Sequence, residues 1–271
     1  MVKTKVTLIS YSPDMERVCA SAMRSCYSQF SATELFQKKE LLSQENVTKM
    51  LEKAIALGHY DVLEHASLTF CMENVSRALT HQLVRHRLAS YSQQSQRHVK
   101  IVKDDWFIKP KSFNDKDKIH KINGMKSKLD YDAFMSLSKQ IYHMYVDMGV
   151  HKQDARFILP SACITNITIT TNPREFRHIF GLRCDSTSQW EIQDVCWAML
   201  STAKLVAPTI FKTLPPPAGK DESAIEKCHI LDKILLDYIN QFEKTSRGDI
   251  IEIDLDKLNL FHKVQSNIIK Y

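Results

Sequence analysis

The sequence is poor in glycine. It holds six glycines in 271 residues, roughly 2% where about 7% is usual. Neither G-x-G-x-x-G nor G-x-x-x-x-G-K-[ST] occurs, which excludes the glycine-rich loops of Rossmann folds and P-loop NTPases. H-E-x-x-H and C-x-x-C are also absent, so the sequence contains no recognised metal or dithiol motif and we expect no metal site.

Long apolar runs are absent as well. No stretch approaches the ~20 residues that span a membrane, and residues 1–10 lack the features of a signal peptide. The seven cysteines are scattered and odd in number, as is typical of a cytosolic protein with reduced thiols. The net charge of +6 suits an anionic substrate but is too small for a dense DNA-binding face. We therefore expect a cytoplasmic protein that binds neither membranes nor nucleic acid.

Residues 85–97 are unusually rich in hydrogen-bond donors. They read RHRLASYSQQSQR and contain no acid. Guanidinium groups bind phosphate and planar oxygen pairs bidentately, and the serines and glutamines add neutral donors beside them. The segment predicts a pocket for a polyanion with a planar polar edge, such as a nucleotide.

Periodicity and composition predict a mixed α/β fold. Strands are predicted at 5–10, 66–72, 163–171 and 249–254. Helices are predicted at 45–57, 75–84, 131–148, 152–158, 173–182, 188–206 and 229–243. Residues 85–97 are expected to start at a helix end and continue as a loop, residues 111–128 to form a mobile surface insertion, and residues 215–219 to form a linker. The fold class is α/β, with a central sheet flanked by helices in one domain (1–215) and a C-terminal appendage of unknown role (216–271).

Two further groups of cations stand apart from this segment. Arg174, Arg177, His178 and Arg183 lie on or after a helix that Asn172 caps, and such cations are as often a solvated face as a binding site. Arg156 is flanked by apolar residues, where an arginine is more often an ion-pair partner than a ligand. Ser95 has no local base, so phosphate binding is a better interpretation for it than nucleophilic attack.

Several segments resemble the flavin-dependent thymidylate synthase family. Arg85-His86-Arg87, seven residues, and then Ser95-Gln96-Arg97 resemble the signature of that family. The supporting matches are Gly58-His59, Glu64-His65, Gln82, residues 155–160 (ARFILP), residues 172–178 (NPREFRH), Leu182-Arg183 and residues 189–192 (QWEI). The resemblance covers about residues 5–210.

The resemblance implies a fold, a reaction and an assembly. The family fold is an α/β domain that forms a homotetramer, with each site built from several subunits. Such enzymes methylate dUMP to dTMP, taking a methylene group from methylenetetrahydrofolate and reducing power from NADPH through bound FAD. They are thought to form no covalent adduct between enzyme and substrate.

The resemblance also assigns roles to residues of this sequence. Arg183 corresponds to the catalytic arginine, which stabilises the ionised N3 of the uracil ring. The positions that correspond to dUMP binding are Gln82, Arg85, Gln93, Ser95, Arg97, Arg156 and Arg183. Those that correspond to FAD binding are Asp61, Arg85, His86, Arg87, Gln93, Asn172, Arg174 and His178. His59 would lie near the entrance for flavin and folate.

The sequence departs from the family pattern at four positions. Some relatives carry glutamate at Gln93 and an amide at His178. A small hydroxyl residue is common at Asp61, and serine at Cys26. These differences bear on single FAD contacts.

Two alternatives remain at this point. A nucleic-acid-binding module would use the basic segment on phosphates, but it would need aromatic residues for stacking, and Tyr91 is the only one among residues 85–97. A flavoprotein reductase would oxidise NADPH without transferring a methyl group.

Overall fold

The computed structural model describes residues 3–113, 120–122, 125–127, 131–214 and 251–254. The predicted linker at 215–219 and the predicted helix at 229–243 lie outside these residues, as does much of the predicted insertion at 111–128. Among the described residues, no helix has the length and apolar character needed to cross a membrane.

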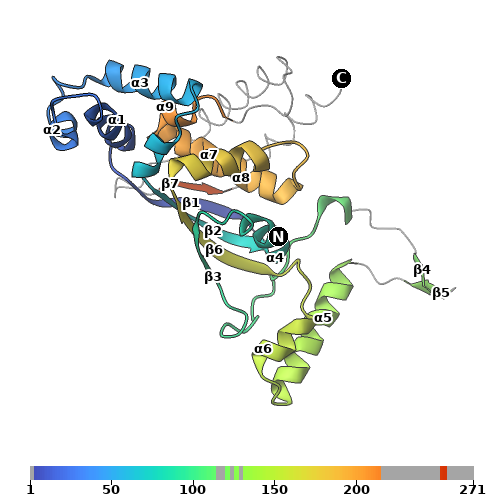
Figure 1. Ribbon diagram of the computed structural model, residues 1–271. Coiled ribbons are helices and arrows are strands. Elements are labelled where there is room, and N and C mark those ends of the chain that lie inside the picture. Colours follow the sequence, from blue (N-terminus) through green and yellow to red (C-terminus); the bar gives the residue numbers. More distant parts are fainter. Residues whose placement is uncertain (1–2, 114–119, 123–124, 128–130, 215–250, 255–271) are drawn as a thin grey trace, which may run out of the picture.

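A five-stranded sheet forms the centre of the molecule (Figure 1). Its order is β3-β6-β2-β1-β7, and every neighbouring pair is antiparallel. The strands are β1 (Lys5–Tyr11), β2 (Leu68–Ser76), β3 (Ser90–Gln93), β6 (Ile164–Thr171) and β7 (Ile251–Asp254). A separate two-stranded antiparallel sheet pairs β4 (His120–Ile122) with β5 (Met125–Ser127).

The central strands have one buried face. In β6, Ile167 and Ile169 are buried, whereas Asn166 and Thr168, which alternate with them, are half-buried. Successive side chains of a strand point to opposite faces, so Thr165, Ile167, Ile169 and Thr171 face the core and the residues that alternate with them lie on the half-buried face. Phe70 of β2 lies on the same buried face, because it pairs with Ile169.

Helices cover this buried face and the two ends of the sheet. They are α1 (Met15–Ser25), α2 (Ala32–Gln37), α3 (Gln44–Ala56), α4 (Arg77–Leu83), α5 (Tyr131–Asp147), α6 (Lys152–Ala155), α7 (Pro173–Arg183), α8 (Trp190–Val206) and α9 (Pro208–Phe211). Short 3₁₀ turns are η1 (Asp61–His65), η2 (Lys111–Phe113) and η3 (Arg156–Ile158). Figure 1 shows α7 and α8 lying along the sheet, α1 to α3 at one end, and α5 with α6 projecting at the other.

Helix ends follow the signals in the sequence. Gly58 after α3 has φ 77° and Gly149 after α5 has φ 90°, the left-handed conformation that glycine adopts without strain. At α7, the side chain of Asn172 accepts a hydrogen bond from the Glu175 N–H, and Pro173 occupies the first turn. The predictions for these three helices are confirmed.

The structure differs from the prediction at residues 85–97. The segment was expected to continue as a loop after the helix end, but its middle part, residues 90–93, forms β3, which pairs with β6, and residues 94–97 continue without a strand. Tyr91 is opposite Ile169 and Gln93 is opposite Ile167, so both point to the core side of an edge strand whose other face is exposed. An edge strand with one solvated face tolerates the serines that made the segment resemble a loop. Helices α1, α2 and α9 were not predicted.

The buried carboxylate of Glu16 fixes the start of α9. It accepts hydrogen bonds from the backbone N–H groups of Thr209 (2.6 Å) and Ile210 (3.0 Å) and from the Thr209 hydroxyl (2.9 Å). These contacts hold α1 against α9, because they join residues 193 and 194 positions apart.

We predict that Glu16→Ala lowers the free energy of unfolding by about 3 kcal/mol, since several buried donors lose their acceptor. Urea unfolding measures this change. Glu45→Ala is the control, because it removes only an exposed ion pair with Lys49 and should change the value by less than ~0.5 kcal/mol. Equal effects of the two substitutions would contradict the role assigned to Glu16.

Candidate functional site

The signature segment begins where α4 ends. Arg85 and Arg87 are exposed, whereas His86 between them is 5% exposed. The Tyr91 hydroxyl lies 2.9 Å from the carbonyl oxygens of both Leu83 and His86. This contact from β3 holds the backbone so that the imidazole points inward and the two guanidinium groups point outward.

His86 meets Arg183 at the end of α7. The Nε–H of Arg183 donates to Nε2 of His86 at 3.1 Å, and Nη2 donates to the carbonyl oxygen of Gln82 at 3.4 Å. The guanidinium is half-buried. Its remaining N–H groups are therefore oriented by two contacts with the end of α4, and they stay available for a ligand.

Two further side chains of α7 surround His86. The Nδ1 atom of His86 lies 3.7 Å from Oε1 of Glu175, which is longer than a hydrogen bond. The rings of His86 and His178 meet edge to face, with centroids 5.6 Å apart. Burial, followed by the charges of Arg183 and His178, lowers the pKa of His86 to about 4. Burial raises the pKa of Glu175. His86 is therefore neutral at physiological pH.

His86, Glu175 and His178 could also hold a metal ion. Each offers one ligand atom, and these atoms lie within 4.8 Å of one another. The sequence motifs gave no sign of this cluster, because the three residues come from segments that meet only in the fold. His86 can ligate through Nδ1 only without a proton there, a condition that the contact with Arg183 opposes.

The other predicted FAD-binding residues lie near this cluster or at the surface. The Asn172 side chain is the cap of α7, and Nη1 of Arg174 forms an ion pair with Glu64 at 2.5 Å. Asp61 begins η1 and is exposed, as is His59 before it.

Three predicted dUMP-binding residues, Gln93, Ser95 and Arg97, lie in β3 and in the turn that follows it. Gln93 donates from Nε2 to the hydroxyl of Thr80 at 3.0 Å, so part of its amide is used within the fold. The Ser95 hydroxyl accepts a hydrogen bond from the backbone N–H of Arg97 at 3.2 Å, and the Arg97 side chain is exposed.

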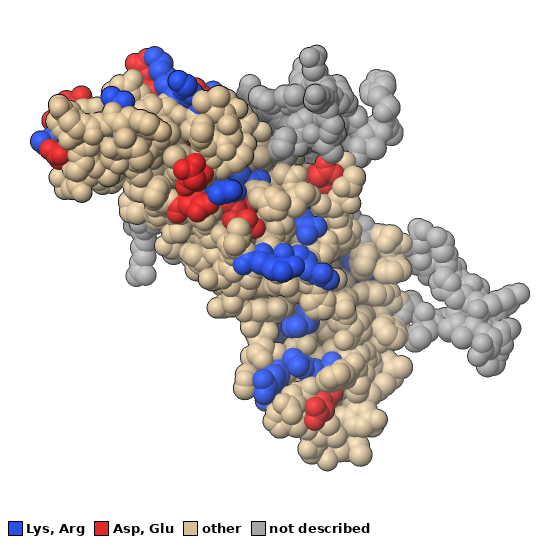
Figure 2. Space-filling model, in the orientation of Figure 1, with Lys and Arg blue, Asp and Glu red and all other residues tan. Residues whose placement is uncertain are grey.

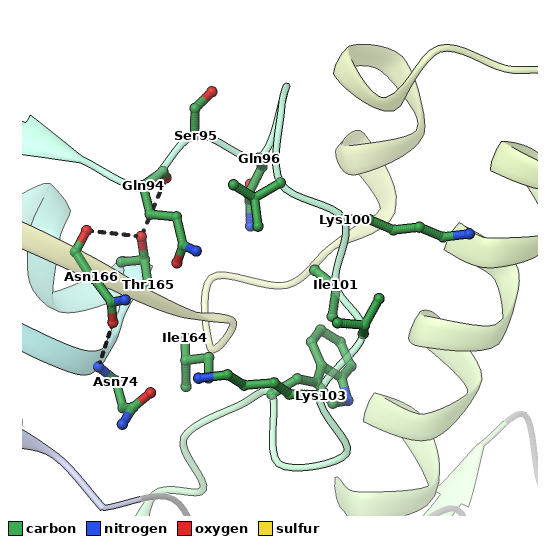
Figure 3. A pocket seen from close by; sticks show the side chains of 13 residues that line it. Asn74, Gln94, Ser95, Gln96, Lys100, Ile101, Lys103, Ile164, Thr165 and Asn166 are labelled. Carbon is green, nitrogen blue, oxygen red and sulfur yellow. Dashed lines mark hydrogen bonds between the residues drawn. The ribbon is translucent and has the colours of Figure 1, made fainter.

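A small cavity lies beside this turn (Figure 3). Its volume is about 110 Å³, below the ~300–1,000 Å³ of pockets that enclose a whole drug-sized ligand. Amide side chains of Gln94, Gln96 and Asn166 line it together with Ser95. This cavity can enclose only part of a nucleotide.

Arg156 lies apart from the Arg183 cluster. It begins η3, and its Nε donates to the carbonyl oxygen of Gln153 at 3.1 Å. Its charge adds to burial in lowering the pKa of Arg77, so two cations share this region. Among the described residues, no hydrogen bond or ion pair links Arg156 or Arg97 to Arg183.

The charged side chains on the surface are spread in the same way as these arginines. Figure 2 shows Lys and Arg side chains spaced down the middle of one face, and Asp and Glu side chains gathered mainly towards the α1–α3 end. A band of cations of this kind attracts anionic ligands.

Comparison with known proteins identifies the family. A family model described as thymidylate synthase complementing protein matches residues 7–209. A flavin-dependent thymidylate synthase from Geobacter sulfurreducens is 44% identical over 214 residues, which cover 78% of this chain and 87% of that relative. A protein of the same name from Clostridium tetani is 42% identical over 224 residues, with the same coverage of 78% and 87%. The chain belongs to the flavin-dependent thymidylate synthase family.

The flavin-dependent thymidylate synthase family is a family of methyltransferases, so the chain is an enzyme of that class. The resemblance inferred from the signature is confirmed. A solved structure, that of the UMP/dUMP methylase PolB from Streptomyces cacaoi bound with 5-Br dUMP, has a TM-score of 0.63 and covers 77% of this chain and 93% of that one. At 18% identity, this likeness shows a shared fold.

The sequence did not reveal Glu175 or Tyr91 as parts of this site. Glu175 stands three residues after the cap Asn172, where a glutamate is typical of a capping box. Tyr91 gave no signal because its partners are backbone carbonyls. Contacts of this kind emerge only when β3 is placed on the sheet edge.

The lowered pKa of His86 predicts a loss of stability in acid. His86 has a pKa near 6.5 when unfolded and about 4 in the fold, where it faces Arg183, His178 and Glu175. The stabilisation from its neutral form is fully present above pH 6.5, and it is lost as the pH falls towards 4. Thermal unfolding midpoints of the wild type and of His86→Gln, measured between pH 4 and 7.5, should converge as the pH falls. A constant difference would contradict this assignment.

Proposed function

We propose that the protein converts dUMP to dTMP, with methylenetetrahydrofolate as the carbon donor and NADPH as the reductant through bound FAD. The family supports methyl transfer to dUMP, and the relatives' name supports a flavin. The observation that carries the proposal is the oriented guanidinium of Arg183, which His86 and Gln82 hold while part of its N–H groups stays free.

Arg183 is the proposed catalytic residue. To accept a one-carbon unit, the uracil ring must become nucleophilic at carbon. A guanidinium beside N3 stabilises the ionised ring and moves electron density into it. The half-buried position of Arg183 favours this role, because charges interact more strongly away from bulk water.

The dUMP phosphate and sugar would be bound by the remaining cations and amides. We assign this to Gln82, Arg85, Gln93, Ser95, Arg97 and Arg156, besides Arg183. Ser95 serves as a binding group here, since its hydroxyl is engaged with the backbone of Arg97 and has no base partner.

The residues assigned to FAD fit an anionic, planar cofactor. Arg85 and Arg87 are exposed, and no ion pair links either of them to a carboxylate among the described residues, so both can bind phosphate. His178 is exposed beside the buried ring of His86. Asp61, His86, Gln93, Asn172 and Arg174 complete the assigned set. When bound, FAD supplies the hydride that reduces the transferred carbon to a methyl group.

We further propose a homotetramer with sites shared between subunits. Arg156 and Arg97 have no link to Arg183 within the described chain, and the cavity beside Ser95 is too small for the whole nucleotide. A second copy would complete such a site. The division at residue 215 and a cytoplasmic location remain part of this proposal. No observation favours nucleic acid as the ligand, because Tyr91 points inward and cannot stack on a base.

The test is an assay for dTMP from dUMP, methylenetetrahydrofolate and NADPH, with a parallel reaction in which the protein has been stripped of flavin and FAD is omitted. We expect dTMP only in the reaction that contains FAD. NADPH oxidation at the same rate with and without dUMP, and with no dTMP formed, would instead indicate a reductase.

We predict that Arg183→Ala lowers the turnover number by about 10²–10³-fold, because a preorganised donor at the developing charge is lost. The flavin absorbance of the purified variant should match that of the wild type. Full activity of this variant would refute the role assigned to Arg183.

For Ser95→Ala we expect a weaker effect, mainly a higher KM for dUMP, because one hydrogen bond to the ligand is lost. Steady-state kinetics at varied dUMP concentration measure it. Complete loss of turnover with unchanged dUMP binding would identify Ser95 as a nucleophile.

A further inference from the structure

A buried carboxylate lies behind the arginine that we assign to catalysis. We propose that Glu175 is a positioning residue, which orients Arg183 by fixing the tautomer of His86. This inference rests on the proposed function, because it concerns the same arginine. It adds a residue to which neither the sequence motifs nor the family resemblance assigned a role.

The hydrogen bond between Arg183 and His86 shows which tautomer the fold holds. Arginine Nε always carries its proton, so Nε2 of His86 must be the acceptor. A neutral imidazole has one N–H, which is therefore on Nδ1. This Nδ1–H faces Oε1 of Glu175 at 3.7 Å, and a carboxylate at that position favours the tautomer electrostatically. In the other tautomer, two N–H groups would point at each other.

Glu175 reaches His86 in place of the partner expected at its position. In α2, Ser31 is the cap and Glu34 stands three residues later, where its side chain accepts from the Ser31 N–H. Glu175 has the same spacing from Asn172, but only the bond from its own N–H to the Asn172 side chain forms. The Glu175 carboxylate turns inward to His86 and is nearly buried, with the residue 7% exposed.

Stability does not explain this burial. Desolvation raises the pKa of Glu175, so the fold opposes its charged form. A carboxylate that costs stability and contacts a functional group is typical of a residue kept for function. The same geometry disfavours a metal ion at this cluster, because the proton on Nδ1 occupies the position that a metal would need.

The test removes the negative charge of Glu175 and keeps the shape of its side chain. Glu175→Gln offers either an oxygen or an NH₂ group to Nδ1, so it no longer selects one tautomer. We expect the turnover number for dTMP formation to fall by about 10- to 100-fold, as for groups that orient a functional residue from behind. The KM for dUMP and the flavin content should stay within a factor of about two, and the unfolding midpoint should not fall.

The matched control is Glu16→Gln. Glu16 is buried to the same degree as Glu175, at 6% exposure against 7%, but its partners are at the start of α9. This variant should lower the unfolding midpoint and leave the turnover number unchanged. The pair separates a positioning role from the general cost of changing a buried carboxylate.

Two further measurements report the mechanism itself. Arg183→Lys keeps the charge but lacks the Nε–H donor, so adding Glu175→Gln to it should have no further effect on turnover. Nitrogen-15 spectra of histidine-labelled protein should show His86 with its proton on Nδ1 in the wild type and a mixed tautomer in Glu175→Gln.

The outcomes are distinguishable. Wild-type turnover in Glu175→Gln, loss of its flavin, or independent multiplication of its effect with that of Arg183→Lys would each overturn the role of Glu175. Full activity of Arg183→Ala would instead overturn the proposed function, whatever Glu175→Gln does.

Discussion

The hydrogen bond from Arg183 to His86 joins positions 97 residues apart and determines how the site is arranged. Its geometry follows from the sheet. Strand β2 leads directly into α4 and β6 into α7, and the two strands are antiparallel neighbours, so the helices start at opposite ends and turn back. Helices of 7 and 11 residues span about 10 and 16 Å, which together match the ~27 Å of an eight-residue strand. Their C-terminal ends therefore meet.

The elements that set this geometry could be predicted from the sequence because their signals are local. Alternating β-branched residues identified β6, and Asn172 with Pro173 identified the start of α7. Gly58 and Gly149 identified two helix ends for the same reason. Strand β3 was not predicted because its sequence, SYSQ, lacks the alternating β-branched or apolar residues that indicate a strand. Its formation depends on the free edge of β6, a partner far away in the sequence.

The residues of the proposed site could be assigned from the sequence only through family resemblance. The arginines of residues 85–97 indicated an anion, but no pattern connects them to Arg183. Glu175 was hidden by a local signal, since its spacing from Asn172 is that of a capping box. The Glu175 carboxylate could contact either the backbone N–H of Asn172 or the ring of His86. Tertiary contacts decide between these two partners, and here the carboxylate lies beside His86. Spacing along the chain cannot decide between them.

The neutral state of His86 explains why an imidazole stands between Glu175 and Arg183. A carboxylate in direct contact with the guanidinium would orient it equally well, but it would also neutralise the charge that an ionised substrate needs. An imidazole with a pKa of about 4 carries no charge at physiological pH. Its Nδ1 faces Glu175 while its Nε2 accepts from Arg183, so the carboxylate can orient the guanidinium without contacting it. The negative charge of Glu175 stays behind His86, separated from Arg183 by the ring. Arg183 is thereby fixed in direction while its positive charge remains available to the ligand.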